Sequence, residues 1–330
     1  MKIVDALAHV TADQLAAILA AARTSLAHQA LLKSLPAMNA VQVGGGVSRS
    51  RLPAEISVAA WNVERGLFPE QNSDLLASLM PDIVLLSEVD HGMARTNQRH
   101  TTEEMASALG MTYAFGVEFH ELDLGGPTER PFCDDDFNAC GWQGNAILSA
   151  VPFEAVTMVR LDDHGHWFAS DELDADPQQP RVGGRMALLA ILPRETGPVC
   201  VVSTHLESNA DCAHRALQFD RLMDAVDVFA PNMPVLIGGD LNTGNHLPPD
   251  FNWRRETLFA RARARGYTWD ATPDGITTRP SLITPHPTRK MKLDWFFTRG
   301  LKCVQQALVP ALGSDKVPLS DHDVIWCSVS

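Results

Sequence analysis

The sequence predicts a mixed α/β fold, and two observations lead to that prediction. From residue 56 onward, short apolar runs typical of strands alternate with segments whose apolar residues recur at helical spacing. Three of the apolar runs, at 145–149, 186–192 and 199–203, follow one another with no helical segment between them. Because strands joined without a helix usually pair antiparallel, we expect mixed, largely antiparallel sheets rather than a uniform β–α–β winding.

The first expected element is a helix over residues 11–35. Thr11 and Gln14 form a capping-box pattern at its start, and Pro36 lies at or just beyond its end. The apolar positions of this segment recur at helical spacing, at Leu15, Ile18, Leu19, Ala22 and Leu26. A run of three glycines at 44–46 follows and is typical of a linker.

The chain is therefore expected to consist of two parts. Residues 1–50 would form an N-terminal helical extension with a glycine-rich linker, and residues 51–330 would form the main domain. The helix of the extension would dock against the main domain; the alternative is a role in dimerisation or as a lid.

The elements of the main domain follow in chain order. Strands are expected at the apolar runs 56–61, 83–87, 145–149, 186–192, 199–203, 235–237, 293–297 and 324–329. Helices are expected at 72–80 and at 256–265, the latter with Gly266 as C-cap. A third helix, capped by Thr101 and Glu104, should end before Gly110. A fourth should carry Phe219, Leu222, Met223 and Val226 on one face. Two long loops remain, at 123–143 and 162–184, and loops of such length are usually functional or disordered.

The composition indicates a soluble enzyme. The chain has 330 residues, of which 45% are hydrophobic and 20% charged, which is ordinary for a globular protein. No apolar stretch approaches the roughly 20 residues that a membrane helix needs, and the first residues lack the basic-then-apolar order of a secretory signal. The six cysteines contain no CxxC pair, which favours reduced thiols and a cytoplasmic location.

Six short polar clusters adjoin the apolar runs. They are Trp61-Asn62-Val63-Glu64, Ser87-Glu88-Val89, Ser203-Thr204-His205-Leu206, Gly238-Gly239-Asp240-Leu241-Asn242, Lys292-Leu293-Asp294-Trp295 and Ser320-Asp321-His322. Strands hold side chains rigidly while their ends reach solvent, so polar groups at strand ends suit a metal–phosphate site. Any one cluster alone would have an ordinary structural explanation, but six together indicate one hydrolytic site.

This ordered set resembles the endonuclease/exonuclease/phosphatase superfamily, which includes pancreatic-type deoxyribonucleases, abasic-site endonucleases, neutral sphingomyelinases and inositol-polyphosphate phosphatases. The resemblance covers residues 56–329 and makes 51–330 the catalytic domain. It implies a four-layer α/β sandwich, in which two packed, largely antiparallel sheets are flanked by helices. It also implies a catalytic cleft at the end of the sandwich where the six clusters meet.

A metal site is expected from the acidic clusters. Hydrolysis of a phosphodiester needs a cation to offset the phosphate charge and donors to stabilise the crowded phosphorus centre. Glu88 and Glu64 are oxygen ligands suited to Mg²⁺ or Mn²⁺. Asn62 can hold the phosphate or a metal-bound water, and the resemblance makes Asp321 a metal ligand or a supporting carboxylate.

The catalytic residues are expected in the later clusters. Asp240 and Asn242 lie two apart on a strand end and so face the same side. The resemblance implies that Asp240 orients or deprotonates the attacking water and that Asn242 holds a phosphate oxygen. It also pairs Asp294 with His322, because a carboxylate on one nitrogen orients an imidazole and favours its cation. His205 matches a second family histidine that contacts the phosphate or the leaving group.

Substrate-binding residues are expected around these clusters. Arg185 matches a phosphate-facing arginine of the family, and a guanidinium is well shaped for that contact. Asn145 lies on the strand that resembles the one following the family's substrate loop. Arg95, Arg99 and His100 follow Glu88 closely, in a loop that borders the cleft in this fold, and are candidates for substrate recognition.

The net charge of -13 bears on the substrate class. Proteins that grip duplex DNA draw most of their affinity from basic side chains that neutralise phosphates, and an acidic surface opposes this. We therefore expect a divalent-metal-dependent phosphoesterase that cleaves a phosphodiester of a small or lipid-like ester, with extended nucleic acid disfavoured. The alternatives are a DNA endonuclease or exonuclease of the same superfamily and, in a different class, a catalytically silent binding module. No oligomeric state is predicted.

Overall fold

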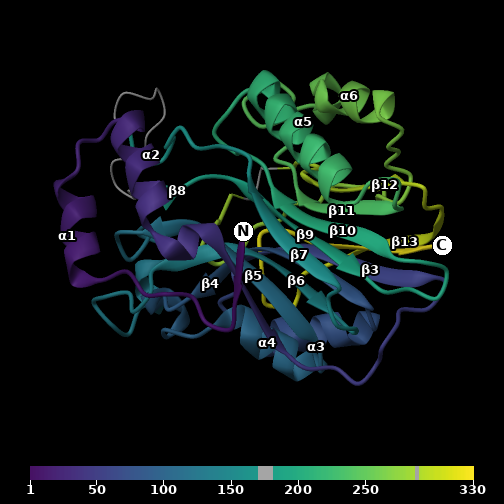
Figure 1. The fold of residues 1–330 in the computed structure, drawn as a ribbon, viewed down its shortest axis with the longest axis horizontal. Coiled ribbons are helices and arrows are strands. Elements are labelled where there is room, and N and C mark those ends of the chain that lie inside the picture. The colour runs from purple at the N-terminus through teal and green to yellow at the C-terminus, as the bar shows by residue number, and fades with distance from the viewer. Residues whose placement is uncertain (170–180, 287–289) are drawn as a thin grey trace.

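Two β-sheets packed against each other form the centre of the molecule, and helices cover their outer faces (Figure 1). The computed structural model describes residues 1–169, 181–286 and 290–330. Within those residues the larger sheet has nine strands and the smaller sheet has five. The four-layer α/β sandwich expected from the sequence is confirmed.

The larger sheet has the strand order β1-β2-β5-β6-β4-β3-β14-β13, with β8 beside β5. Its neighbouring strands are antiparallel except for the pairs β1–β2 and β3–β4. The strands span β1 (Lys2–Val4), β2 (Ala40–Gly45), β3 (Ile56–Arg65), β4 (Ile83–His91), β5 (Thr112–Glu121), β6 (Trp142–Ser149), β8 (Arg181–Gly183), β13 (Cys303–Val309) and β14 (Val324–Val329).

The smaller sheet has the order β12-β11-β10-β9-β7, and its only parallel pair in the described chain is β10–β11. The mixed, largely antiparallel pairing that the consecutive apolar runs predict is therefore confirmed for both sheets. The strands span β7 (Ala155–Arg160), β9 (Met186–Leu192), β10 (Val199–His205), β11 (Val235–Asp240) and β12 (Asp294–Arg299).

The strands read as continuous apolar runs because both of their faces are buried. In β3, Val58 and Ala60 pack between the two sheets, whereas Ala59 and Trp61 pack toward the helices. Successive side chains of a strand point to opposite faces, so one apolar run supplies two separate cores.

The helices that cover the larger sheet are α3 (Pro69–Leu79) and α4 (Thr101–Leu109), and those that cover the smaller sheet are α5 (Cys212–Phe229) and α6 (Leu258–Ala264) (Figure 1). The apolar face predicted around residue 222 is buried against the smaller sheet, as expected. Short 3₁₀ helices complete the elements, at η1 (Pro36–Asn39), η2 (Ala94–Thr96), η3 (Arg130–Phe132) and η4 (Trp253–Arg255).

The N-terminal segment contains two helices rather than the single one expected. They are α1 (Ala12–Ala20) and α2 (Ser25–Ser34). The capping box at Thr11 is present, with the Gln14 backbone N–H donating to Thr11 Oγ1 at 3.2 Å. The break occurs because Thr24 caps the second helix, accepting a hydrogen bond from the Ala27 N–H at 3.3 Å. A capping threonine in extended conformation ends the preceding helix and starts a new one.

The glycine run at 44–46 does not form the expected linker. Gly44 and Gly45 belong to β2, which pairs with β5 of the larger sheet. A Cβ atom added at Gly44 would lie 2.6 Å from the hydroxyl of Tyr113, so the glycine permits a close approach rather than flexibility. The N-terminal segment thus contributes β1 and β2 to the same sheet as the motif strands, and a domain boundary at residue 50 remains a prediction.

The cap expected for α4 is also wrong. His100 is the N-cap residue and makes no side-chain cap bond, whereas the Thr101 hydroxyl donates to the carbonyl of Asp90 at 2.8 Å. Gly110 ends the helix in a left-handed conformation, as predicted.

Irregular ends of β3 and β4 turn their polar side chains toward the smaller sheet. The pairing of these strands shifts register between Asn62 and Arg65, and Glu64 and Glu88 have positive φ angles of 47° and 57°. An extra residue in a strand re-aims the side chains that follow it, and such irregularities are common beside active sites. In the smaller sheet, Asp240 pairs in register with both His205 and Asp294. None of the described helices is long and apolar enough to cross a membrane.

Candidate active site

Five of the six polar clusters contribute residues to the lining of one cavity of about 170 Å³, and the first cluster is hydrogen-bonded to that lining through Asn62 and Glu64. From the larger sheet comes Glu88, at the end of β4, and from the smaller sheet come His205 and Asp240. The segment 320–322 closes the cavity because it is bonded to β3: the Ser320 hydroxyl donates to the carbonyl of Asn62 at 2.6 Å. The indole N–H of Trp61 in turn donates to the carbonyl of His322 at 2.9 Å.

An imidazole stands between two carboxylates at the centre of the site. His322 Nδ1 lies 2.8 Å from Asp294 Oδ2, and His322 Nε2 lies 3.5 Å from Asp240 Oδ2. Burial alone would lower the pKa of His322, but the carboxylates of Asp294, Asp240 and Asp321 hold that pKa well above its usual value. The ring is therefore an imidazolium with a hydrogen-bond donor directed at the cavity.

Asp240 is ionised in this setting. Burial would raise its pKa, but the neighbouring His322 and His205 hold that pKa below its usual range. Its Oδ1 atom accepts a hydrogen bond from the Asn242 backbone N–H at 2.8 Å, and its Oδ2 atom accepts one from the Asn62 side chain at 3.1 Å. The carboxylate is thus fixed in orientation and negatively charged.

Asn62 links the two sheets. The same Nδ2 atom that donates to Asp240 also donates to Glu88 Oε1 at 3.0 Å, and Asn62 Oδ1 accepts from the backbone of Glu64 at 3.0 Å. One amide therefore sets the spacing between the metal-ligand candidate Glu88 on the larger sheet and Asp240 on the smaller sheet.

Glu64 lies behind Asp321 at the edge of the cavity. Its carboxylate accepts hydrogen bonds from the Ser281 hydroxyl at 2.6 Å and from the Asp321 backbone N–H at 3.1 Å. Burial, and then the charge of Asp321, raises the pKa of Glu64 to about 7. A divalent cation would favour the ionised form of this acidic group.

The oxygen ligands in this region fit a hard divalent cation. Glu88 and Asp321 line the cavity, Asn62 is bonded to Glu88, and Glu64 stands beside Asp321. Carboxylate and amide oxygens are the ligands that Mg²⁺ and Mn²⁺ prefer. In the described residues, Glu88 is also ion-paired with Arg65, so cation binding would compete with or rearrange this contact.

His205 lies near the same Asp240 oxygen as His322. Its Nε2 atom is 3.6 Å from Asp240 Oδ2 and 4.0 Å from Glu88 Oε1. Arg185 lies against the same ring, with one terminal nitrogen 2.9 Å from His205 Nδ1. The histidine therefore faces the cavity between two carboxylates, as its position in the third cluster predicts.

Contrary to expectation, Arg185 does not face the cavity. Its guanidinium is buried and donates to Glu118 and Glu207, at 3.2 Å each, and to the Ser208 hydroxyl at 3.2 Å. These partners occupy N–H groups of the guanidinium, so Arg185 supports His205 rather than lining the cavity.

Asn145 is likewise placed away from the cavity. It is fully buried, and its Nδ2 atom donates to the carbonyl of Met186 at 3.1 Å. The strand that carries it, β6, lies next to β4 as the family pattern implies, but this side chain packs between the sheets rather than at their end. We therefore withdraw Asn145 as a substrate-binding residue.

Arg95 is a structural residue rather than a substrate contact. Its side chain is fully buried and forms a double hydrogen bond to Asp90, at 2.7 and 2.8 Å. It also donates to Glu121 at 2.9 Å and to Glu129 at 3.1 Å. A guanidinium surrounded by three carboxylates inside the protein cannot reach a substrate, so this expectation was wrong.

Arg99 and His100 lie outside the cavity as well. Arg99 is ion-paired with Glu70 and Glu104 and lines a different hollow, on the α3–α4 side of the larger sheet. His100 is half-buried and stacks on His91 with a ring-to-ring distance of 3.8 Å. The loop after β4 turns away from the strand end that carries Glu88, which is why proximity in sequence was misleading here.

Several cavity residues carry no sequence signal. The cavity is also lined by Ser208, Thr278, Arg279, Thr284 and His286. The segment that begins at Thr277 reaches the site through backbone pairing, in which Thr278 bridges to His322 and the Asp323 N–H donates to the carbonyl of Thr277 at 2.7 Å. Only their positions, just after the His205 cluster for Ser208 and before the Asp294 cluster for the others, could have suggested these residues.

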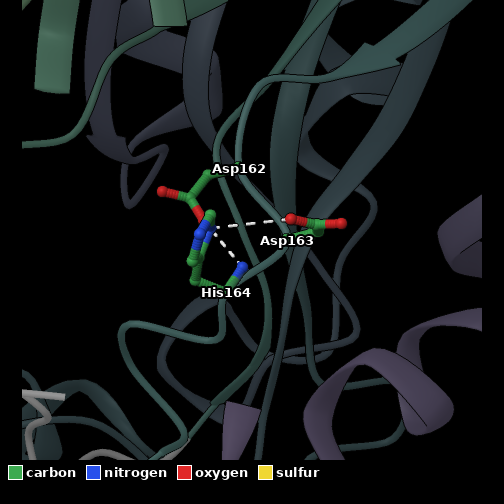
Figure 2. Close-up of side chains that lie close together, drawn as sticks. All are labelled: Asp162, Asp163 and His164. Atoms are coloured by element: carbon green, nitrogen blue, oxygen red, sulfur yellow. Dashed lines mark hydrogen bonds and ion pairs between the residues drawn. The ribbon is translucent and has the colours of Figure 1, made fainter. Parts of the chain in front are cut away.

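A second acidic group lies outside the cavity. Asp162, Asp163 and His164 lie close together after β7 (Figure 2), with His164 Nδ1 3.3 Å from Asp162 and 3.6 Å from Asp163. Asp162 is already bonded to His214 at 2.8 Å, and Asp163 and His164 are exposed. Contacts between side chains of this protein therefore account for the arrangement of this acidic group.

The match to a family model decides the family. Residues 59–322 match the model of the endonuclease/exonuclease/phosphatase family. The chain belongs to this family. Its members are phosphoesterases, so the general reaction class expected from the six clusters is confirmed, while the substrate is not specified by the match.

Solved structures of this family share the fold. An endonuclease/exonuclease/phosphatase from Beutenbergia cavernae is 18% identical with a TM-score of 0.59, covering 83% of this chain and 71% of that one. The catalytic domain of human Nocturnin with bound sulfate is 18% identical with a TM-score of 0.55, covering 85% and 96%. D. rerio TDP2 with single-strand DNA product is 17% identical with a TM-score of 0.53, covering 84% and 99%. No curated protein matches the chain.

Proposed function

We propose that this protein is a Mg²⁺- or Mn²⁺-dependent phosphodiesterase that acts on a phosphate ester of low molecular weight. The observation that carries the proposal is the convergence of Glu88, His205, Asp240 and His322 on one small cavity. A volume of about 170 Å³ accommodates a phosphoryl group and a few waters.

The cation would be held by Glu88 and Asp321, with Asn62 and Glu64 beside them. When bound, it would offset the negative charge of the phosphate. The Asn62 amide donates both to Glu88 on the larger sheet and to Asp240 on the smaller sheet, so the packing of the sheets fixes the spacing of these groups before substrate arrives.

The chain's own residues would accept the proton of the attacking water and stabilise the negative charge that forms on the phosphate. Asp240, ionised and fixed in orientation, would align a water molecule and accept its proton as the new P–O bond forms. The imidazolium of His322, held by Asp294, would donate a hydrogen bond to a phosphate oxygen and stabilise the added charge. Asn242 is anchored to the carbonyl of Leu206 at 3.0 Å; because its amide carries two hydrogens, it could also donate to the phosphate.

His205 lines the same cavity as His322, so it would be within reach of the same phosphate. Its contact with Arg185 fixes the ring against Glu118, which lies 3.6 Å from Nδ1. We assign it to the phosphate or to the departing oxygen, as the family resemblance implies.

A DNA endonuclease or exonuclease is the second candidate, because a similar fold in D. rerio TDP2 holds a single-strand DNA product. The acidic composition, with a net charge of -13, argues against that function. A catalytically silent binding module is disfavoured because every one of the six clusters keeps its polar residues. The expected cytoplasmic location remains part of the proposal, and all six cysteines are free thiols.

Hydrolysis of bis(p-nitrophenyl) phosphate tests the proposal directly. We expect release of p-nitrophenol with Mg²⁺ or Mn²⁺ and none in excess chelator or in the His322→Ala variant. Supercoiled plasmid is the parallel substrate. Full activity in chelator would contradict the metal dependence, and turnover of plasmid alone would favour the nuclease.

A further inference from the structure

A second, larger hollow adjoins the catalytic cavity. It has a volume of about 930 Å³ and is lined by Asn245, His246, Pro249, Phe251, His286 and Lys290 among others. The side chain of His286 lines both spaces. Asn245 makes a second connection, because its Nδ2 atom donates to Asn242 Oδ1, in the catalytic cavity, at 2.5 Å. The two spaces are therefore neighbours that share a wall.

The loop that forms this hollow is held in place from beneath. Arg215, fully buried in α5, donates to the carbonyl of Asn245 at 2.8 Å and is ion-paired with Glu256 at 2.5 Å. Glu256 also accepts from the Gly244 backbone N–H at 2.8 Å. A buried ion pair thus ties both ends of the loop to the body of the protein, so the hollow is a preformed surface.

Two side chains of the hollow are presented by unusual backbone. His246 and Phe251 have positive φ angles of 56° and 49°. Residues other than glycine rarely adopt this conformation, which persists where the surrounding structure imposes it and is concentrated in ligand-binding segments. Phe251 keeps 45% of its surface exposed, which leaves one side of its ring available for contact.

The chemistry of the walls selects a type of ligand. Phe251 and the two prolines at 248 and 249 supply apolar surface, and Lys290 supplies positive charge. The carboxylate in the lining, Asp250, faces Arg255 at 3.8 Å. A flat apolar group, neutral or anionic, is therefore favoured over a cationic one.

Size indicates how the two spaces are used together. The catalytic cavity of about 170 Å³ leaves little room beyond the phosphoryl group, so the organic part of an ester must extend into adjoining space. The hollow behind His286 offers that space with an exposed aromatic ring.

We propose that this hollow is the subsite for an aromatic or similarly flat apolar ester group of the substrate, with Phe251 as the stacking surface. The proposal rests on the proposed phosphodiesterase function and specifies its substrate class: a small phosphodiester with at least one aryl-like ester group.

A pair of phosphonates isolates the contribution of the subsite. Methylphosphonate and phenylphosphonate carry the same anionic head and are not hydrolysed, and they differ by the aromatic ring. We expect the wild-type protein with Mg²⁺ to bind phenylphosphonate about tenfold more tightly than methylphosphonate, measured by calorimetry. In Phe251→Ala this preference should shrink to about twofold, with methylphosphonate binding unchanged.

Phe137→Ala is the matched control, because Phe137 is also an exposed phenylalanine, at 55%, but lies in the 123–141 loop outside both linings. It should keep the full preference. In activity measurements, Phe251→Ala should lower kcat/KM for bis(p-nitrophenyl) phosphate about tenfold, mainly through KM, and should melt near the wild-type temperature because Phe251 is half-exposed.

The outcomes separate the two proposals. If methylphosphonate binds and small esters are hydrolysed but phenylphosphonate gains nothing, or if Phe251→Ala keeps the preference, the subsite is overturned while the phosphodiesterase stands. If neither phosphonate binds and no small ester is hydrolysed, the proposed function fails and the subsite with it.

Discussion

His322 owes its charge to its neighbours. Its two ring nitrogens face Asp294 at 2.8 Å and Asp240 at 3.5 Å, and a third carboxylate, Asp321, lies 3.9 Å from Nε2. Burial of an imidazole normally lowers its pKa, but here the carboxylates outweigh burial and raise it. The residue is therefore a hydrogen-bond donor at neutral pH, and Asp294 acts with it as one unit.

The Asp294–His322 unit should give non-additive losses. We expect Asp294→Ala and His322→Ala each to lower kcat about 10²- to 10⁴-fold, and the double variant to be little worse than the poorer single one. Steady-state kinetics on bis(p-nitrophenyl) phosphate measures this. The Asp162–His214 pair has the same 2.8 Å spacing outside the cavity and is the matched control. Strictly additive losses would mean that Asp294 and His322 act separately.

Glu88 should determine metal affinity. Its carboxylate is partly exposed at the cavity and bonded to Asn62, so Glu88→Gln removes the charge while keeping the shape. We expect at least about tenfold weaker Mg²⁺ binding, a large loss of turnover, and loss of the increase in Tm that Mg²⁺ gives the wild type. Thermal melts across a Mg²⁺ series test this, with Glu55→Gln, an exposed position, as control. An unchanged Mg²⁺ response would remove Glu88 from the metal site.

At the scale of elements, the 123–141 loop is fixed by charge rather than by apolar packing. Glu129, in this loop, bonds Arg95 at 3.1 Å and Arg65 at 2.8 Å, and Arg65 is in turn ion-paired with Glu88. The Thr128 hydroxyl donates to the carbonyl of Ile283 at 2.7 Å, beside the cavity lining. A loop with little apolar sequence is thus ordered next to the site.

Arg95 should be a major source of stability for this loop. Arg95→Ala would leave the buried carboxylates of Asp90, Glu121 and Glu129 without their shared cation. We expect the free energy of unfolding to fall by about 3–5 kcal/mol, measured by urea denaturation. Arg49→Ala breaks an exposed pair with Asp82 of similar length, 2.8 Å, and should cost less than about 1 kcal/mol. Equal losses in the two variants would contradict the structural role of Arg95.

The junction of β4 and α4 should make stability depend on pH. Burial lowers the pKa of His100 to about 2 and that of His91 to about 4, so the folded protein keeps both rings neutral. Unfolded histidines take up a proton below about pH 6.5. The unfolded state therefore binds more protons than the folded state below that pH, and stability falls as the pH drops from about 6.5 toward 4.

Replacing one ring of this pair tests the effect. His100→Phe keeps a flat ring against His91 and removes one titrating group. Between pH 7 and pH 5, its free energy of unfolding should therefore fall by about 1–2 kcal/mol less than that of the wild type. Chemical denaturation at the two pH values measures the difference. His246→Phe, at an exposed position, is the control. An identical loss in wild type and His100→Phe would show that His100 does not contribute.

At the scale of the whole molecule, positive charge near the cavity is already neutralised. Arg65 pairs with Glu88 and Glu129, Arg185 with Glu118 and Glu207, and Arg279 with Asp323 at 2.6 Å. A duplex would bring many phosphates against a protein of net charge -13, whereas a small ester brings one or two. The electrostatics thus favour small substrates.

We therefore expect little binding to duplex DNA at about 0.15 M salt. A salt titration of plasmid binding by gel shift, alongside a nicking assay at low enzyme concentration, measures this. Turnover of a small phosphodiester under the same conditions is the positive control. Efficient nicking without turnover of small esters would reverse the order of the two candidate functions.

The sequence by itself determined the parts of this protein that depend on local pattern. Apolar runs fixed eight strands, because a strand buried on both faces must be apolar along its length. Six further strands of the described residues were missed; one of them, β5, is equally buried but carries Glu118, His120 and Glu121, which break the apolar pattern. The polar residues at the strand ends were assigned to one site because six such clusters occur in the order of one hydrolytic constellation, and the structure places Asp240 in register with His205 and Asp294.

Only the tertiary structure decided which charged residues serve the site and which serve the fold. Arg95 and His100 are close to Glu88 in sequence, but the chain turns after β4, which buries Arg95 and stacks the half-buried His100 on His91. In contrast, His286 and Phe251 have no motif around them, and long-range contacts place them beside the cavity. The fate of a charged side chain depends on its partners across the fold, which local sequence does not specify.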